Sequence, residues 1–151
     1  MKLDDFDRKI LNRLQDDASS PIETIAAEIG LSRNACWRRI KALEANNVLT
    51  RRIALVDPQT VGAGLSAFIM IRTNRHEPEW IETFNRAVQD IPKIVGVYRT
   101  SGDIDYIVRV RVADMAGYDL LYQKLIRKVS LSDVSATFVM ETIKETFAVP
   151  V

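Results

Sequence analysis

The chain has 151 residues, of which 47% are hydrophobic and 27% are charged, and its formal net charge at pH 7 is +1. This composition is typical of one or two folded domains and excludes a fibrous or disordered protein. No apolar run reaches the ~18 residues of a transmembrane helix, the acidic N-terminus lacks the apolar stretch of a signal peptide, and the single Cys36 has no partner for an intrachain disulfide. We therefore expect a cytoplasmic protein with no membrane partner.

The small net charge hides an uneven distribution. Residues 30–52 contain six Lys/Arg and one acid, a net charge of +5, whereas the segments before and after them carry −3 and −1. Positive charge concentrated in one short segment indicates a polyanionic partner, which the total charge does not reveal.

Three short helices are predicted in the first third of the chain. Apolar residues recur at helical spacing over residues 4–17. Pro21 suits the first position of a second helix, and Gly30 is placed to end it in a left-handed conformation. Ser32 is the expected N-cap of a third helix that runs to about Asn46. The short turn containing Gly between the last two helices predicts a helix-turn-helix.

The segment that follows, residues 48–56, alternates loosely and is predicted to be extended, where a winged helix-turn-helix has its wing. A short linker with Pro and Gly is expected over residues 55–63. The sequence thus predicts a winged helix-turn-helix domain over residues 1–54 and a second domain over residues 64–151.

The second domain alternates strands with helices. Strands are predicted at residues 65–73, 94–100, 104–113 and 135–147, and helices at residues 77–90 and 115–129. The order βαββαβ is that of a ferredoxin-like fold, so the predicted class of the whole chain is α+β.

Apolar residues on both faces of these strands indicate self-association. "AFIMI" (residues 67–71) and "ATFVM" (residues 136–140) do not alternate strictly between apolar and polar residues. A four-stranded sheet with two helices has only one face covered by its own chain, and soluble monomers rarely expose a large apolar face. A second copy packing sheet against sheet would bury this face, so we expect a homodimer.

One side of the third helix has the chemistry of a DNA-recognition surface. Cys36, Ile40 and Leu43 share a face that would pack on the first two helices. The candidate DNA-binding residues lie on the other side of this helix, at its N-cap and in the expected wing: Ser32, Arg33, Asn34, Trp37, Arg38, Lys41, Arg51 and Arg52. Arginine pairs with guanine and asparagine with adenine in the major groove, which the first turns of a recognition helix enter. The alternative, a basic face that is only solvated, does not account for the helix-turn spacing and the N-cap.

Two residues of this helix have open roles. Arg39 lies beside the buried face, where an ion pair with an acid of the first helix is as good an explanation as DNA contact. Trp37 could meet a thymine methyl group or the DNA backbone, or pack on the neighbouring helix.

Little in the sequence supports catalysis. The only histidine, His76, lies in a polar loop, and the chain has no Cys/His cluster with metal-binding spacing, no Gly-rich phosphate loop and no nucleophile–base pair. Asp103 and Asp105 are better explained as residues that cap a turn. We therefore predict no enzyme, no catalytic residue, no metal and no cofactor.

Four stretches, in order and at the right spacing, resemble the Lrp/AsnC (feast/famine) family of transcriptional regulators. "LDDFDRKIL" (residues 3–11) is similar to the opening of that family, and "IAAEIGLSRNACWRRIKALE" (residues 25–44) to its recognition segment. "SGDIDYIVRVRVADMAGY" (residues 101–118) resembles the GDxDYLL signature, and "FVMETIKE" (residues 138–145) the last strand. The resemblance implies a sequence-specific regulator of transcription that binds double-stranded DNA, forms homodimers and often tetramers or octamers, and responds to a small effector, commonly an amino acid.

The resemblance also implies an effector-binding site at the GDxDY turn, which in this chain comprises Ser101, Gly102, Asp103, Asp105 and Tyr106. Glycine lets backbone N–H groups approach a carboxylate, and an acidic side chain can pair with an amino group. In the alternative, Gly102 and Asp103 serve only the hairpin turn, and Tyr106 only the core.

The chain departs from the family pattern at two places. "EANNVL" (residues 44–49) has Asn where Gly is usual before the wing, and Asn tolerates positive φ, so the turn can survive. "VSLSDV" (residues 129–134) stands where "LPGV" is usual, which alters a loop near the expected effector site. Two other functions therefore stay open: a ligand-independent architectural DNA-binding protein of the same fold, and an amino-acid-binding regulatory subunit of an enzyme.

Overall fold

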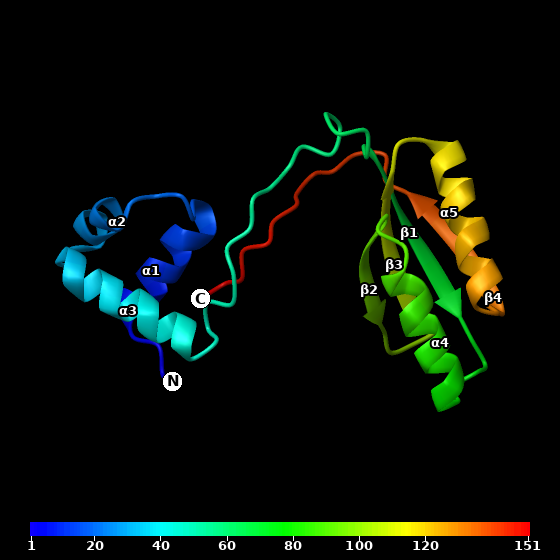
Figure 1. Cartoon of the computed structure of the whole chain (residues 1–151), viewed down its shortest axis with the longest axis horizontal. Coiled ribbons are helices and arrows are strands. Elements are labelled where there is room, and N and C mark those ends of the chain that lie inside the picture. The colour runs from blue at the N-terminus through cyan, green and yellow to red at the C-terminus, as the bar shows by residue number, and fades with distance from the viewer. The chain divides into compact units, whose positions relative to one another are not determined.

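The computed structural model describes residues 1–151 as two compact units (Figure 1). Residues 1–55 and 144–151 form the first, which is helical, and residues 56–143 form the second, which holds a four-stranded antiparallel sheet and two helices. The predicted α+β class is confirmed. None of the helices has the length and apolar character that crossing a membrane requires.

The first unit contains helices α1 (Asp5–Asp16), α2 (Ile22–Ile29) and α3 (Arg33–Ala45). Two predicted helix signals are confirmed: Gly30 ends α2 in the left-handed region with φ of 75°, and the Ser32 hydroxyl accepts a hydrogen bond from the backbone of the first turn of α3 (3.2 Å). Pro21, expected at the first position of α2, is instead its N-cap. Local sequence therefore determines where each helix of the helix-turn-helix begins and ends.

The core of the first unit is small and almost wholly aliphatic. Its buried members come from all three helices: Ile10, Leu11, Leu14, Ile25, Ala26, Cys36, Ile40 and Leu43. The predicted inner face of the third helix is confirmed, since its three residues are at most 2% exposed. The end of the chain belongs to this unit too, because the Gln15 amide on α1 accepts from the Val149 N–H (2.6 Å) and donates to the Val149 carbonyl (3.1 Å).

No strand follows α3, so the prediction of a β wing is wrong. Residues 50–56 pair with no other strand, and all four strands of the chain lie in the second unit. The turn before them forms as expected without glycine: Asn47 has φ of 55°, and the N–H groups of Val48 and Leu49 donate to the Leu43 carbonyl (2.9 and 3.1 Å).

The second unit has the predicted βαββαβ order. Its elements are β1 (Leu65–Arg72), α4 (Pro78–Gln89), β2 (Ile94–Arg99), β3 (Tyr106–Val112), α5 (Met115–Lys128) and β4 (Asp133–Phe138). The strands lie in the order β2-β3-β1-β4, and every neighbouring pair is antiparallel. Strands β2 and β4 are therefore the free edges of the sheet.

The last strand is much shorter than predicted. Strand β4 ends at Phe138, which pairs with Ala67, and the Val139 N–H still reaches the Ser66 carbonyl (2.9 Å). Beyond that point β1 has only Leu65 left to pair, so residues 139–147 leave the sheet although their sequence is typical of a strand. Tertiary partners overrule local propensity here.

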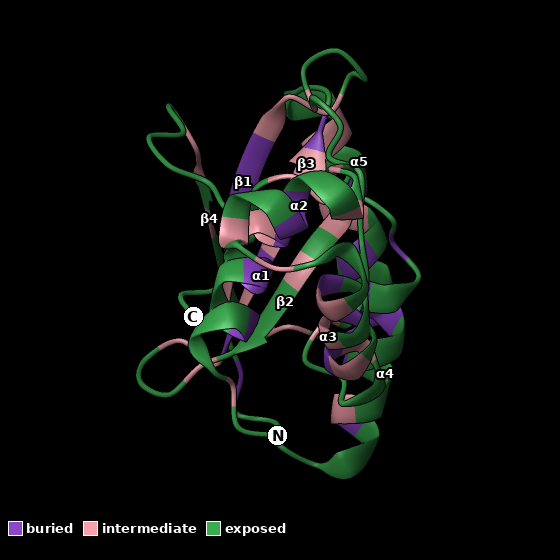
Figure 2. Ribbon diagram, turned by 90° about the vertical axis from the view of Figure 1, so that its left-hand side faces the viewer, coloured by how far each residue is buried: buried purple, intermediate pink, exposed green.

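Alternate residues of the sheet face opposite sides. Along β3 buried and half-buried residues alternate strictly, and the buried ones pack with α4 and α5 (Figure 2). The opposite side, which we call the open face, has no helix of this unit over it. Its apolar members, identified from the strand register, are Phe68, Met70, Tyr98 and Ile107. The expected apolar residues on the second side of the sheet are thus present on β1, β2 and β3, although β3 also carries Arg109 and Arg111 there. On β4 the expectation is wrong, because Phe138 faces the helices and the open side carries Ser135 and Thr137.

Candidate nucleic-acid interface and effector-binding region

The side of α3 that faces away from the core is exposed along its length. Its polar and aromatic members, with the N-cap, are Ser32, Arg33, Asn34, Trp37, Arg38 and Lys41, all exposed. The structure thus brings six of the eight predicted DNA-binding residues onto one surface. Trp37 is 48% exposed and in no contact with another aromatic ring, so it does not serve the core.

The start of α3 also suits an anion. The first N–H groups of a helix have no intrahelical partner, and the helix dipole places partial positive charge there. Ser32 satisfies only one of them, the N–H of Ala35. The backbone N–H groups of Arg33 and Asn34 are left for a phosphate oxygen.

Glu44 links the recognition helix to the extended segment behind it. One carboxylate oxygen lies 2.8 Å from Lys41 Nζ and the other 3.1 Å from Arg52 Nη2. The hydrogen bond from Lys41 and the charges of both cations hold the pKa of Glu44 below its usual value. Glu44 is therefore ionised at neutral pH, and any other anion that approaches these two cations must compete with it.

The remaining cations among the predicted DNA-binding residues also differ in whether an acidic side chain is paired with them. Arg33 forms an ion pair with Glu23 of α2, whose pKa is lowered by hydrogen bonds from its own backbone N–H and from Arg33. Arg38 and Arg51 are exposed and have no acidic partner. These two side chains are consequently the freest to engage a nucleic acid.

Arg39 has a structural role. Its Nη1 lies 2.8 Å from a carboxylate oxygen of Asp4 and 2.8 Å from one of Asp7, whose side chain is only 5% exposed. Its guanidinium also lies over the Phe6 ring, 5.4 Å from the centroid. Arg39 therefore forms the ion pair with acids of the α1 region, one of its two expected roles, the other being DNA contact. Asp4 and Asp7 additionally form a capping box at the start of α1, so the opening motif of the chain both starts a helix and holds α3 against it.

The turn between β2 and β3 holds the predicted effector residues, but their side chains do not converge. Ser101, Gly102 and Asp103 are exposed, and Gly102 has φ of 120°, a conformation that favours glycine. The Asp105 carboxylate accepts a hydrogen bond from the backbone N–H of Thr73 (2.8 Å). The Asp105 N–H donates to the carbonyl of Ile71 (3.0 Å). Asp105 therefore joins the turn to the end of β1.

Tyr106 lies in the core. It is 5% exposed, and its ring centroid is 4.7 Å from that of Phe84 and 5.9 Å from that of Trp80. Its placement matches the alternative in which the tyrosine serves packing. The exposed part of the turn consists of the three residues before Ile104.

Arg72, at the end of β1, joins the turn to the loop that departs from the family pattern. Its Nε donates to the Asp103 carbonyl (2.9 Å), and its Nη1 lies 2.7 Å from a carboxylate oxygen of Asp133. In the same loop, the Ser132 hydroxyl donates to the Asn74 side chain (3.1 Å). Sequence reasoning missed Arg72, because its only signal was a cation directly after an apolar strand.

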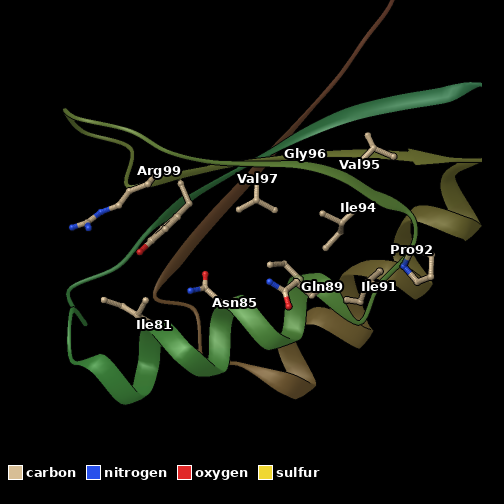
Figure 3. A pocket seen from close by; sticks show the side chains of 12 residues that line it. Ile81, Asn85, Gln89, Ile91, Pro92, Ile94, Val95, Gly96, Val97 and Arg99 are labelled. Carbon is tan, nitrogen blue, oxygen red and sulfur yellow. The ribbon is translucent and has the colours of Figure 1, made fainter. Parts of the chain in front are cut away.

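A groove of about 530 Å³ lies between α4 and the edge strand β2. In Figure 3, Ile81, Asn85 and Gln89 point from α4 toward β2, and Val97 and Ile94 point back from the strand. Arg99 and Tyr106 line one end of the groove. No sequence motif marked this groove, since its residues come from separate elements. Nowhere do three or more His, Cys, Asp or Glu side chains gather in a way that could hold a metal ion.

Known proteins resemble this chain over nearly its whole length. Residues 3–44 match the AsnC-type helix-turn-helix domain, and residues 66–149 match the Lrp/AsnC ligand binding domain. The glutamate uptake regulatory protein of Zymomonas mobilis is 46% identical over 99% of this chain and 91% of its own length. The DNA-binding transcriptional activator DecR of Escherichia coli is 41% identical over 99% of both chains.

Solved structures agree with this likeness. An AsnC family transcriptional regulator from Agrobacterium tumefaciens has a TM-score of 0.95 and 44% identity over 98% of this chain and 97% of its own. The Neisseria meningitidis transcriptional regulator NMB0573, in complex with L-methionine, has a TM-score of 0.93 and 29% identity over 99% and 97%. The chain with this basic recognition helix and this βαββαβ domain therefore belongs to the Lrp/AsnC family of transcriptional regulators, with a helix-turn-helix DNA-binding domain and a ligand-binding domain.

Proposed function

We propose that this regulator reads its operator mainly with the exposed side of α3. The observation that carries the proposal is the division of that helix into a buried face of Cys36, Ile40 and Leu43 and an exposed basic face. Arg38 supplies a bidentate donor for a base edge, and Arg51 supplies charge for the phosphates. The other proposed contacts are Ser32, Arg33, Asn34, Trp37, Lys41 and Arg52.

We propose that residues 1–54 act as the DNA-binding domain and residues 64–151 as the domain for effector binding and oligomerisation. The apolar residues of the open face, which lie there beside Arg109 and Arg111, support a homodimer packed sheet against sheet. The family resemblance supports tetramers or octamers built from it. A two-fold dimer would read a roughly palindromic site. Its place of action is the cytoplasm, where the chromosome is accessible, and we propose no enzymatic activity.

We propose that the effector is an amino acid. The Neisseria relative that binds L-methionine supports this class of ligand. In the turn, the exposed backbone of Ser101 and Gly102 suits a carboxylate, and the Asp103 side chain suits an amino group. Asp105 and Tyr106 contribute by holding the turn in place, through Thr73 and through the core.

A second candidate is an architectural DNA-binding protein of the same fold that needs no ligand. The engagement of Asp105 and Tyr106 within the protein favours it, because these side chains are then not available to an effector. It predicts DNA binding that no amino acid alters. An amino-acid-binding subunit of an enzyme would instead show no affinity for DNA.

The test is fluorescence anisotropy with duplexes selected from a random library, at several salt concentrations. We expect affinity to fall steeply with salt. Arg51→Ala should weaken binding to all duplexes and reduce the salt slope by about one unit, whereas Arg38→Ala should relax preference at one base pair at a cost of about 1–3 kcal/mol. Arg127→Ala, an exposed cation on α5, is the matched control. If the three variants bind alike, the proposed interface is wrong.

A further inference from the structure

Trp37 is the only aromatic residue of α3, and it lies on the exposed side of that helix. It occupies the fifth position of the helix, with Arg33 one turn before it and Lys41 one turn after it. The residue is 48% exposed although its side chain is the largest on this side. The first turns of a recognition helix enter the major groove, so Trp37 would face the base edges there.

The indole of Trp37 has no partner within the protein. Its Nε1–H donates no hydrogen bond, and its ring stacks on no other ring. The other tryptophan of the chain differs in both respects: Trp80 Nε1 donates to the Ser130 carbonyl (2.9 Å), and its ring stacks on that of Phe84. Trp80 therefore serves the core, whereas Trp37 keeps an apolar ring face and a donor for a partner outside the chain.

One base edge in the major groove matches these two properties. Thymine presents an apolar group there, the C5-methyl, next to the O4 acceptor, and no other base of DNA has this methyl group. An indole supplies one donor and no acceptor. Cytosine has an amino donor in place of O4, so two donors would face each other without an acceptor. A tryptophan on the reading side of α3 is therefore suited to thymine and unsuited to cytosine.

The neighbouring cations do not offer such a contact without cost. Arg33 is paired with Glu23, and Lys41 Nζ lies 2.8 Å from a Glu44 carboxylate oxygen, so each must leave an ion pair before it can bind DNA. Trp37 has no such interaction to break. An indole also has only two side-chain torsions to fix, so little conformational entropy is lost when it is held against a base.

We propose that Trp37 selects thymine in the operator through contact with its C5-methyl group. This inference rests on the proposed reading of DNA by α3 and adds the base that the middle of the helix recognises. In a roughly palindromic site the same thymine should occur once in each half. A tryptophan that lay against the sugar-phosphate backbone would instead bind equally well with and without the methyl group.

The experiment compares thymine with deoxyuridine, whose base lacks only the C5-methyl group and pairs with adenine in the same way. The thymines of a duplex selected by the full chain are replaced one at a time, and affinity is measured by fluorescence anisotropy. We expect one replacement in each half-site to weaken binding about fourfold, as expected when one buried carbon group is lost from an apolar contact.

Variants of α3 assign this loss to Trp37. In Trp37→Ala, duplexes with thymine and deoxyuridine at the sensitive position should bind alike, whereas Trp37→Phe keeps an apolar ring and should retain a preference for thymine. Arg38→Ala is the matched control, because it should weaken binding and yet leave the fourfold ratio unchanged. Low salt keeps the weaker variants measurable, and thermal melting checks that each variant folds.

Two results would overturn the proposal: no deoxyuridine replacement weakens binding, or Trp37→Ala keeps the ratio between the two duplexes. If Arg38→Ala and Arg51→Ala act as proposed while deoxyuridine has no effect, only the thymine contact is wrong. If the parent binds no duplex, the DNA-binding proposal is wrong as well.

Discussion

The ion pair between Arg39 and the acids of α1 makes a sharp prediction for stability. Arg39→Ala removes a guanidinium 2.8 Å from a carboxylate whose side chain is 5% exposed. After the substitution, the Asp7 carboxylate keeps one hydrogen bond, from the Asp4 N–H at 3.2 Å. A hydrogen bond to a charged group is worth about 1.5–3 kcal/mol, and a buried charge left without its partner costs toward the upper end. Arg39 itself is 32% exposed, so solvent screens part of the loss, and we expect about 2 kcal/mol.

This loss should appear only in the unfolding of the first unit. Trp37 reports on that unit, so Trp80→Phe provides a background in which tryptophan fluorescence follows it alone. In urea, the free energy of unfolding should fall by about 2 kcal/mol, equivalent to a melting temperature lower by about 8–16 °C for a unit of this size. Arg38→Ala is the matched control, because Arg38 is the neighbouring cation but has no acidic partner, and its effect should stay within about 0.5 kcal/mol. Equal effects of the two substitutions would refute the argument.

Three further predictions concern other parts of the chain. Met70→Asp places a charge on the open face, so sedimentation should show the protein shifting from dimer to monomer. An unchanged sedimentation coefficient would argue against sheet-to-sheet association. Glu44→Gln removes an anion beside Lys41 and Arg52. It should strengthen salt-dependent DNA binding several-fold, measured by fluorescence anisotropy. Weaker binding would contradict the idea that this acid competes with DNA phosphate for the two cations. Hydrogen bonds from Ser19 and Ser20 lower the pKa of Asp17 to about 2. Its contribution to stability should be present above about pH 4 and lost as pH falls through 2, so the melting temperature of Asp17→Asn should depend less on pH in that window.

Much of the helix-turn-helix could be predicted because its signals are local. The Ser32 cap, the left-handed Gly30 and the spacing of Cys36, Ile40 and Leu43 act between residues within a few positions of one another. The open face of the sheet was likewise visible as apolar residues on both sides of the strands. The exposed basic side of α3 follows from the same periodicity, because a helix with one buried face must expose the other.

Other features depended on partners distant in the chain. The length of β4 depends on where β1 stops, and the expected wing has no second strand with which to pair. The groove needs α4 and β2 together, and sequence reasoning had no motif that could have found Arg99 there. By itself the sequence determined the helices, their caps, the order of the strands and the location of the positive charge, since these depend on adjacent residues. Only the tertiary structure decided that Arg39 binds Asp4 and Asp7 and that Tyr106 lies in the core, because such contacts join side chains that folding alone brings within a few ångströms.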